Sequence, residues 1–418
     1  MGNNISKKTL FFFLETIDSP FIPEEIRYIS PYFEKIVLVP ISGAKECYFS
    51  LPSNVKIEYS LNEVFQNRVI LTKLGFKALF NKLVYKEILI FRNNPYKLLK
   101  AFWRTLKFEI LSEVVSIWLK EVKFSNIEFG NRNSYVFYSF WLNAVIYGLC
   151  KSDVGTTCKI ISRAHGYDIY ENRHKPPFFP FRDFYINRID LIICASKSGS
   201  LHLQEKYPLQ KDKILFSYLG IMNLNSLPEP KSIRKDFVIV SCSSVSDVKR
   251  VEKIALALSK ISNINFSWYH IGSGPRLIFL RILKIVLEKN NQSWHFLGYV
   301  QNANINKIYE KISPNLFINL SSSEGVPVSI MEAARAGIPV LASQVGGNVE
   351  IIEDSRNGFL IDSFMPVNEI SNKIQEIAQH KDVLKYYAFN IRKTFENDFR
   401  AEDNYEKFIL ILRNKNII

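Results

Sequence analysis

Residues 321–340 read Ser321-Ser-Ser-Glu-Gly-Val-Pro-Val-Ser-Ile-Met-Glu-Ala-Ala-Arg-Ala-Gly-Ile-Pro-Val340. The stretch follows an apolar, strand-like run at 315–320, and its second half is apolar nearly all round, as in a buried helix. Pro327 suits the first turn of that helix, Gly337 suits the position that stops it, and Pro339 follows the stop. The sequence therefore predicts a strand, a loop and a helix, which is the repeating unit of a parallel α/β sheet.

Two glutamates lie in this unit, Glu324 in the loop and Glu332 inside the helix. A buried carboxylate is costly unless it is paired or hydrogen-bonded. Glu332 therefore needs a partner, and a ligand with hydroxyl donors would supply one. The N-terminus of the helix attracts phosphate through unsatisfied N–H groups and the helix dipole. Its amides belong to Gly325, Val326, Val328 and Ser329. One element could thus hold a diphosphate and a ribose together.

The pattern Glu-x7-Glu followed by Gly-x-Pro-Val, with Gly346-Gly-Asn-Val-Glu350 beyond it, resembles the retaining GT-B glycosyltransferases of the glycogen-synthase-like group, family 4. The likeness is specific over about residues 236–362 and looser over 1–220. It implies two Rossmann-like, doubly wound α/β domains that face a cleft, and a nucleoside diphosphate sugar as donor. It also implies that Glu332 binds the donor ribose and that Glu324 binds the hydroxyls of the transferred sugar.

A basic turn follows the first strand of the second half, at 243–250. The family commonly has an arginine there, five residues before a lysine, and both contact the diphosphate. Lys249 fits the lysine, but Ser244 stands where the arginine is expected. Whether Arg250 substitutes stays open, because adjacent residues on a turn need not point the same way.

Two glycine turns resemble further parts of the family's donor site. Gly272 and Gly274 end a strand, where glycine lets a backbone approach a ligand closely. Tyr299 and Val300 follow Gly298 in a segment that resembles the loop that contacts the nucleobase through its backbone. The residues predicted to bind the donor are Glu332, Arg250, Gly325, Val326, Pro327, Val328, Gly272, Tyr299 and Val300.

His165 and Gly166 end a strand of the first half and resemble the family's His-Gly segment near the donor sugar. Whether His165 is functional or structural stays open at this stage. The residues predicted to take part in catalysis are Glu324, His165 and Lys249. No Asp-x-Asp motif and no metal-ligand cluster is found in the sequence. We therefore expect neither metal nor cofactor, with the leaving group stabilised by Lys249 and the helix N-terminus.

The chain has 418 residues, too many for one ordinary core, so two domains are expected. Apolar strands alternate with helices in both halves, with strands expected at 10–14, 35–39, 134–140, 159–164, 191–195, 237–241, 265–271, 293–297, 315–320, 339–342 and 358–361. We predict an acceptor-binding domain at 1–222, a linker at 223–235 and a nucleotide-sugar domain at 236–395. A C-terminal helix at 396–418 would pack back on the first domain, as GT-B proteins often show.

Composition narrows the environment of the protein. Five scattered cysteines without metal spacing fit a reduced compartment, and we find no secretion signal and no uninterrupted apolar run of 18 residues. The net charge is +14, yet no nucleic-acid-binding signature is visible. We therefore expect a cytoplasmic protein without a nucleic-acid partner.

Lysines and arginines are dense over residues 73–123 and alternate there with aromatic residues. Basic helices with exposed aromatics suit an anionic bilayer surface. The alternative is that the aromatics belong to the core and the lysines to a solvated face. Both interpretations stay open, and the first would place the protein on the inner face of the cell membrane.

The sequence thus predicts a metal-independent, retaining hexosyltransferase that moves a sugar to an acceptor hydroxyl, in cell-surface polysaccharide or glycolipid synthesis. The acceptor would be lipid-linked or an oligosaccharide. The alternative is a catalytically weak GT-B subunit that binds nucleotide and supports a partner enzyme. Ser244, and a first strand without the usual glycine pair after it, keep that alternative open.

Overall fold

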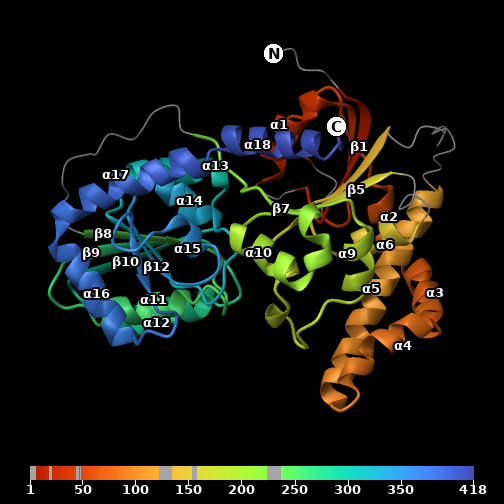
Figure 1. The fold of residues 1–418 in the computed structure, drawn as a ribbon. Helices are drawn as coiled ribbons and strands as arrows, with labels where there is room; N and C mark the ends of the chain where they lie inside the picture. Colours follow the sequence, from red (N-terminus) through yellow and green to blue (C-terminus); the bar gives the residue numbers. More distant parts are fainter. Residues whose placement is uncertain are drawn as a thin grey trace. The chain divides into compact units, whose positions relative to one another are not determined.

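The computed structural model describes residues 6–17, 21–43, 47, 49–121, 134–152, 158–223 and 237–418. It forms two compact units (Figure 1): unit 1 comprises Met1–Tyr218 and Tyr405–Ile418, and unit 2 comprises Leu219–Asn404. Of the predicted linker at 223–235, Asn223 alone lies among the described residues. The last helix, α18 (Ala401–Asn414), begins in unit 2 and continues into unit 1.

The described part of unit 1 contains a seven-stranded parallel sheet in the order β3-β2-β1-β4-β5-β6-β7. Its strands are β1 (Ser6–Leu14), β2 (Phe33–Pro40), β3 (Val55–Ile57), β4 (Tyr135–Ser139), β5 (Lys159–Ala164), β6 (Leu191–Cys194) and β7 (Ile214–Phe216). The sequence predicted five of them. It missed β3 and β7, because each is a three-residue edge strand with one buried residue and therefore no readable pattern.

The helices of unit 1 cover both faces of this sheet. They are α1 (Ile22–Ile29), α2 (Ser60–Gln66), α3 (Arg68–Leu79), α4 (Lys82–Ile88), α5 (Pro95–Glu121), α6 (Ala144–Lys151), α8 (Gly166–Ile169), α9 (Arg182–Arg188) and α10 (Lys197–Lys206), with 3-10 turns η1 (Ser30–Tyr32), η2 (Leu89–Phe91), η4 (Glu171–Arg173) and η5 (Pro208–Lys213). Successive side chains of a strand point to opposite faces. Phe11 and Phe13 accordingly pack on Trp118 of α5, whereas Phe12 stacks on Tyr138.

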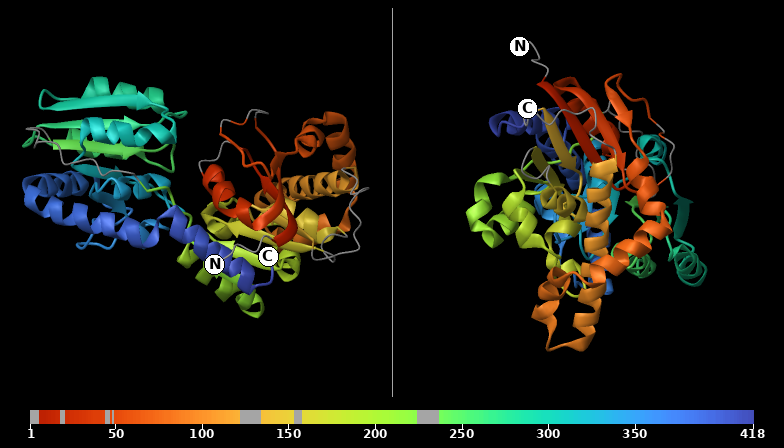
Figure 2. Two further views of the ribbon diagram at one scale, coloured as in Figure 1. Left: turned by 90° about the horizontal axis from the view of Figure 1, so that it is seen from above. Right: turned by 90° about the vertical axis from the view of Figure 1, so that its right-hand side faces the viewer.

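Helices α3, α4 and α5, drawn in orange, form a group that extends beyond the sheet of unit 1 (Figures 1 and 2). Helix α5 alone has 27 residues, about 40 Å of helix. Its C-terminal half is core, since Trp118 is fully buried. Along the rest of the group and the turn η2 within it, ten large apolar side chains are at least 45% exposed. They are Val69, Phe76, Phe80, Leu83, Tyr85, Leu89, Ile90, Tyr96, Leu99 and Trp103. The interpretation that the aromatics belong to the core therefore holds for the C-terminal half of α5, the other aromatics named are exposed, and docking on a membrane stays a prediction. The end of the segment, Lys123, lies outside the described residues.

The described part of unit 2 contains a six-stranded parallel sheet in the order β10-β9-β8-β11-β12-β13. The strands, all predicted, are β8 (Phe237–Cys242), β9 (Phe266–Ile271), β10 (Gln292–Gly298), β11 (Leu316–Asn319), β12 (Val340–Ser343) and β13 (Phe359–Ile361). The helices are α11 (Val251–Ser259), α12 (Leu277–Leu287), α13 (Asn302–Ile312), α14 (Val328–Arg335), α15 (Asn348–Ile351), α16 (Val367–Gln379) and α17 (Lys381–Asp398). Helices α11, α12 and α16 lie on one face, and α13, α14 and α17 on the other (Figure 1).

In each sheet the chain order reverses at one point. It lies between β1 and β4 in unit 1 and between β8 and β11 in unit 2. Ligands of doubly wound domains bind beyond the carboxyl ends of the strands at such a switch point. Within the described residues, no helix is both long and apolar enough to cross a bilayer.

Candidate functional site

The two glutamates of residues 321–340 flank the start of α14 at the switch point of unit 2. Glu324 lies in the loop after β11, and Glu332 lies in the helix, which begins after Pro327. Pro327 is thus the N-cap residue rather than part of the first turn, and Gly337 has the positive φ of 66° expected of a helix stop. Both carboxylates are buried, with 6% of Glu324 and 4% of Glu332 exposed.

The side-chain carboxylate of Glu332 receives no hydrogen bond from any residue that the structure describes. The opposite charge that acts on it is that of Arg335, whose guanidinium donates to the backbone oxygen of Met222 and to the side chain of Asn306. Burial raises the pKa of Glu332 to about 7, and the charge of Arg335 opposes this rise only in part. No described side chain thus donates a hydrogen bond to this buried carboxylate. Glu332 is therefore a candidate group for binding a ligand that carries hydroxyl donors.

Glu324, in contrast, is bound by a residue that follows β8, the neighbouring strand at the switch point. The ammonium of Lys249, in the turn after β8, lies 2.7 and 2.8 Å from its two carboxylate oxygens. The side-chain amide of Asn319 donates a further hydrogen bond of 3.1 Å. The sequence analysis overlooked Asn319, although an amide at the end of an apolar strand was a signal that could have revealed it.

Arg250 points elsewhere than its neighbour Lys249. Its backbone has a positive φ of 48°, and its guanidinium donates to the backbone oxygen and the hydroxyl of Ser363, both at 2.8 Å. Ser244, at the position where an arginine was expected, is an exposed residue of the same turn. The structure therefore brings Lys249, but not Arg250, to the two-glutamate unit.

Two glycines, Gly346 and Gly347, fix the loop before α14. A Cβ atom at Gly346 would lie 2.0 Å from the backbone oxygen of Glu324, and one at Gly347 would lie 2.0 Å from that of Gly325. The amide of Gly347 also donates to Gly325 O at 2.7 Å. These contacts fix the segment that leads into α14, including Val326 and Pro327, and place the first-turn amides at Val328.

The turns after β9 and β10 approach one another in the same unit. Gly272, at a φ of 142°, donates its amide to the oxygen of Gly298 at 2.8 Å, and its position leaves no room for a Cβ atom beside Ser243 O. Tyr299, which follows Gly298, is 77% exposed. The predicted donor residues Gly272, Tyr299 and Val300 therefore lie on adjoining turns at the carboxyl ends of β9 and β10.

His165 lies in unit 1, at the end of β5, with its ring against Phe140 and Trp141. Its Nε2 lies 2.9 Å from the backbone oxygen of Phe140, so Nε2 carries the proton, and the ring accepts from the backbone amide of Asp168 in a capping box at the start of α8. Burial and the charge of Arg163 lower the pKa of His165 to about 3. The imidazole is therefore neutral at physiological pH and can act as a hydrogen-bond acceptor, but not as a general acid.

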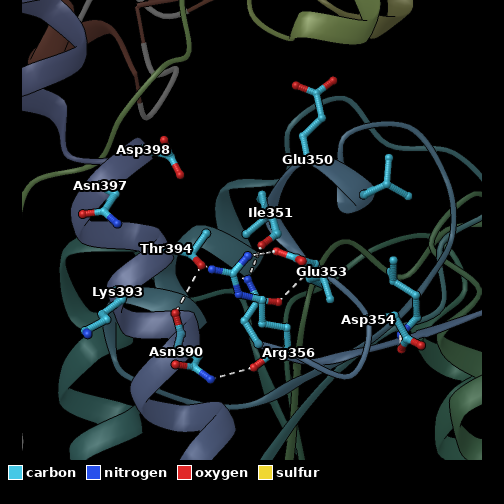
Figure 3. Close-up of a pocket in the computed structure, with 14 residues that line it drawn as sticks. Glu350, Ile351, Glu353, Asp354, Arg356, Asn390, Lys393, Thr394, Asn397 and Asp398 are labelled. Carbon is cyan, nitrogen blue, oxygen red and sulfur yellow. Dashed lines mark hydrogen bonds and ion pairs between the residues drawn. The ribbon is translucent and has the colours of Figure 1, made fainter.

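Unit 2 also contains a polar cavity of about 510 Å³ between the loop after α15 and helix α17 (Figure 3). Within its lining, Arg356 pairs with Glu353, and the side-chain amide of Asn390 donates to the backbone oxygen of Arg356. None of the residues predicted from the sequence lines it. No group of His, Cys, Asp and Glu in the described ranges could hold a metal ion.

Comparisons with known proteins agree with this geometry. Residues 225–394 match the family model described as Glycosyl transferases group 1. The O-antigen biosynthesis glycosyltransferase WbnH of Escherichia coli is 32% identical over 224 residues, which cover 52% of this chain and 60% of that relative. The chain therefore spans less than two thirds of the length of this relative, and it is similar to glycosyltransferases mainly through its second half.

Solved structures cover nearly the whole chain. A glycosyltransferase from Rickettsia africae ESF-5 superposes with a TM-score of 0.65 at 15% identity, over 99% of both chains. Anabaena HepE in complex with UDP gives a TM-score of 0.64 at 15% identity, over 97% of this chain and all of the other. The fold is therefore GT-B, with two parallel-sheet Rossmann-like domains, as predicted.

Proposed function

We propose that the chain is a glycosyltransferase that moves a hexosyl group from a nucleoside diphosphate sugar to an acceptor hydroxyl, with retention at the anomeric carbon. The observation that carries the proposal is the pairing of Lys249 with Glu324 beside the carboxylate of Glu332, which has no donor among the described residues. The likeness to an O-antigen glycosyltransferase supports a role in cell-surface polysaccharide or glycolipid synthesis.

Each group has a task in this reaction. Glu332 accepts hydrogen bonds from the ribose hydroxyls, and Glu324 accepts them from the transferred sugar. The departing diphosphate gains negative charge, which Lys249 and the first-turn amides of α14 stabilise without a metal ion. The resemblance also implies that His165 lies near the donor sugar, where its neutral ring would not act as an acid. Gly272, Tyr299 and Val300 contact the nucleobase.

A screen of nucleotide sugars by thermal shift tests donor binding. A donor at 100 times its dissociation constant stabilises the folded state by about 2.7 kcal/mol. Product analysis by NMR then reads the anomeric configuration, and activity that survives a chelator supports the metal-independent path. A screen in which no nucleotide sugar or nucleoside diphosphate shifts the unfolding temperature contradicts the proposal.

A second candidate function is a nucleotide-binding subunit with weak activity. The specific observation in its favour is that Ser244 stands where the family commonly has an arginine. Lys249 pairs with Glu324, but Arg250 bonds to Ser363 and does not replace the missing arginine. Hydrolysis of the bound donor in the absence of acceptor separates the two, because a working transferase releases sugar slowly to water and a binding subunit does not.

The proposal includes docking on an anionic membrane surface through α3, α4 and α5. The exposed apolar side chains of this group alternate with exposed lysines and arginines, among them Lys73, Lys82, Lys86, Arg92 and Lys97. Such a surface matches a bilayer with acidic headgroups in both charge and hydrophobicity. The acceptor is accordingly a lipid-linked sugar or oligosaccharide.

A further inference from the structure

Unit 1 contains a cavity of about 270 Å³ that is lined by none of the residues predicted to bind the donor or to take part in catalysis. It opens at the switch point of the seven-stranded sheet, because Glu15 directly follows β1 and Trp141 and Asn143 follow β4. In unit 2 the corresponding position between β8 and β11 holds Lys249 and Glu324. Topology alone therefore marks the cavity as a ligand site of its own domain.

Aromatic rings form one wall of the cavity. The ring of His174 lies 4.4 Å from that of Tyr167 and 4.7 Å from that of Phe179, and the ring of Trp141 lies 4.5 Å from that of His165. The face of an aromatic ring carries partial negative charge. It attracts the slightly positive C–H groups on the flat side of a pyranose, so this wall suits a sugar ring.

Two polar side chains stand beside that wall. Asp168 is 5% exposed and accepts hydrogen bonds from the backbone amides of Leu142, at 2.8 Å, and His165. Asn143 caps α6 through its side-chain oxygen, which leaves its amide group to donate. A carboxyl group and an amide placed next to apolar rings are the few convergent polar groups that orient a ligand.

Two cations on the same face of α5 complete the lining. Arg104 donates to the backbone oxygens of Lys175, Pro176 and Phe178, so its charge is not neutralised by those partners. Lys107, one turn further, forms no ion pair with any described residue. A ligand whose ring lies against the aromatic wall would gain most from a negative group near Lys107.

We propose that this cavity binds a sugar phosphate, with the ring against Trp141, a hydroxyl at Asp168 and the phosphate at Lys107. The inference rests on the proposed function, in which this sugar phosphate is the acceptor. The phosphate group is the shared chemistry of two sources, a free sugar phosphate and a sugar phosphate esterified to a lipid.

Calorimetric titration of the full chain with the 1-phosphates of glucose, galactose, mannose and N-acetylglucosamine, and with their methyl glycosides, tests the site. At least one phosphate should bind, and more tightly than its methyl glycoside. Lys107→Met should weaken phosphate binding by about tenfold or more and leave the methyl glycoside unchanged. Lys100→Met, on the same helix but outside the cavity, is the matched control. Trp141→Ala should weaken both ligands.

A second titration distinguishes the free from the lipid-linked sugar phosphate. It uses the sugar that binds most tightly in the first titration, esterified to decyl phosphate and presented in lipid vesicles. Tighter binding there than in free solution assigns a lipid-linked ligand, and equal binding assigns a free sugar phosphate. Binding of the nucleoside diphosphate found in the nucleotide-sugar screen, measured in parallel, should not change in any variant. If the wild type binds no nucleoside diphosphate, the proposed function alone is overturned. The cavity proposal is overturned if no sugar phosphate binds better than its methyl glycoside, or if Lys107→Met and Lys100→Met behave alike.

Discussion

The ammonium of Lys249 lies within 2.8 Å of both carboxylate oxygens of Glu324, so a single cation spans the whole carboxylate. Glu324 is buried, and it also accepts a hydrogen bond from the side-chain amide of Asn319. In the ligand-free protein Lys249 therefore compensates the charge of Glu324. A bound diphosphate would attract Lys249 and so release the carboxylate of Glu324 to accept hydrogen bonds from sugar hydroxyls. Binding of the diphosphate and binding of the sugar by Glu324 would thus be coupled.

Lys249→Ala should lower kcat by about 10²–10³-fold and donor affinity much less, because charge on the leaving diphosphate grows toward the transition state. Lys249→Arg keeps the charge and should retain part of the activity. Steady-state kinetics on the cognate pair provide the measurement. A rise in KM with an intact kcat would make Lys249 a uniform binder, and full activity would transfer its role to Arg250.

The same substitution should destabilise the protein by roughly 1–3 kcal/mol, because a buried acceptor loses its donor. Adding Glu324→Gln removes the unpaired charge, so the double variant should unfold at a higher denaturant concentration than Lys249→Ala alone, without regaining turnover. Denaturant unfolding followed by circular dichroism checks this. An equally unstable double variant would show that the pair does not stabilise the fold.

Glu332→Ala should weaken binding of the cognate nucleoside diphosphate by roughly 1.5–3 kcal/mol, the range for hydrogen bonds to a charged group. Isothermal titration calorimetry measures the change. Glu353→Ala, at an exposed position of the same unit where the glutamate pairs with Arg356, is the matched control and should bind normally. Unchanged affinity in a folded Glu332→Ala protein would remove Glu332 from the site.

The free energy of unfolding of the ligand-free protein should fall as pH rises from about 4.5 to about 7, because Glu332 loses its proton over this range. Its pKa is raised from 4.5 to about 7 by burial, so the folded state binds the proton more tightly than the unfolded state across that window. Glu332→Gln should flatten this slope and raise stability at pH 8 by up to about 3 kcal/mol. Urea unfolding at pH 5 and pH 8 tests it, and a variant less stable than wild type at pH 8 contradicts it.

Gly346→Ala should weaken nucleotide binding, whereas Gly337→Ala should not. Both positions have positive φ, so both substitutions cost about 1 kcal/mol in the backbone. At Gly346 the new Cβ would also lie 2.0 Å from Glu324 O, while at Gly337 the nearest atom is 3.6 Å away. Unfolding curves and UDP titrations of both variants give the comparison. Equal UDP affinity would show that Gly346 does not hold the loop.

Much of the fold could be predicted because its strands are buried on both faces and read as continuous apolar runs, such as Phe11–Phe13. The two edge strands at Val55–Ile57 and Ile214–Phe216 could not be predicted. Each has three residues, of which one is buried, and this is too short to show the alternation typical of a strand. The exposure of Phe80 and Trp103 was equally invisible, because an aromatic residue on a helix reads the same whether or not another element covers it.

The candidate site, too, could be predicted from the sequence only in part. Glu324 and Glu332 could be placed together because they lie on one loop and the helix that follows it, whereas Lys249 follows β8, 75 residues before Glu324, and was indicated by the resemblance to a family. The partner of Arg250, Ser363, lies over one hundred residues further along the chain, and only the tertiary fold brings them together. The cavity at Trp141 also stayed hidden, because its walls come from segments that follow β1, β4 and β5 and from α5.

Vesicles with anionic lipid should bind the protein strongly at low salt and weakly at high salt, through α3, α4 and α5. Each Lys or Arg near such a surface contributes about 1 kcal/mol within a Debye length. Within the basic segment predicted from the sequence, Lys97, Lys100, Arg104 and Lys107 are closely spaced along α5. Arg104, however, holds the backbone at Lys175 and Phe178, and Lys107 lines the cavity of unit 1, so neither suits this experiment.

The variant that separates membrane docking from other functions therefore changes Lys73, Lys86, Lys97 and Lys100 to Glu. It should lose vesicle binding in co-sedimentation assays and keep UDP binding. A control that changes Lys289, Lys307, Lys385 and Lys407 to Glu alters the net charge equally, at exposed positions outside this group. Trp103→Ser with Phe80→Ser should weaken binding at both low and high salt, because the apolar contribution is not screened. If both quadruple variants lose binding alike, attraction follows net charge rather than this surface, and the acceptor need not be membrane-bound.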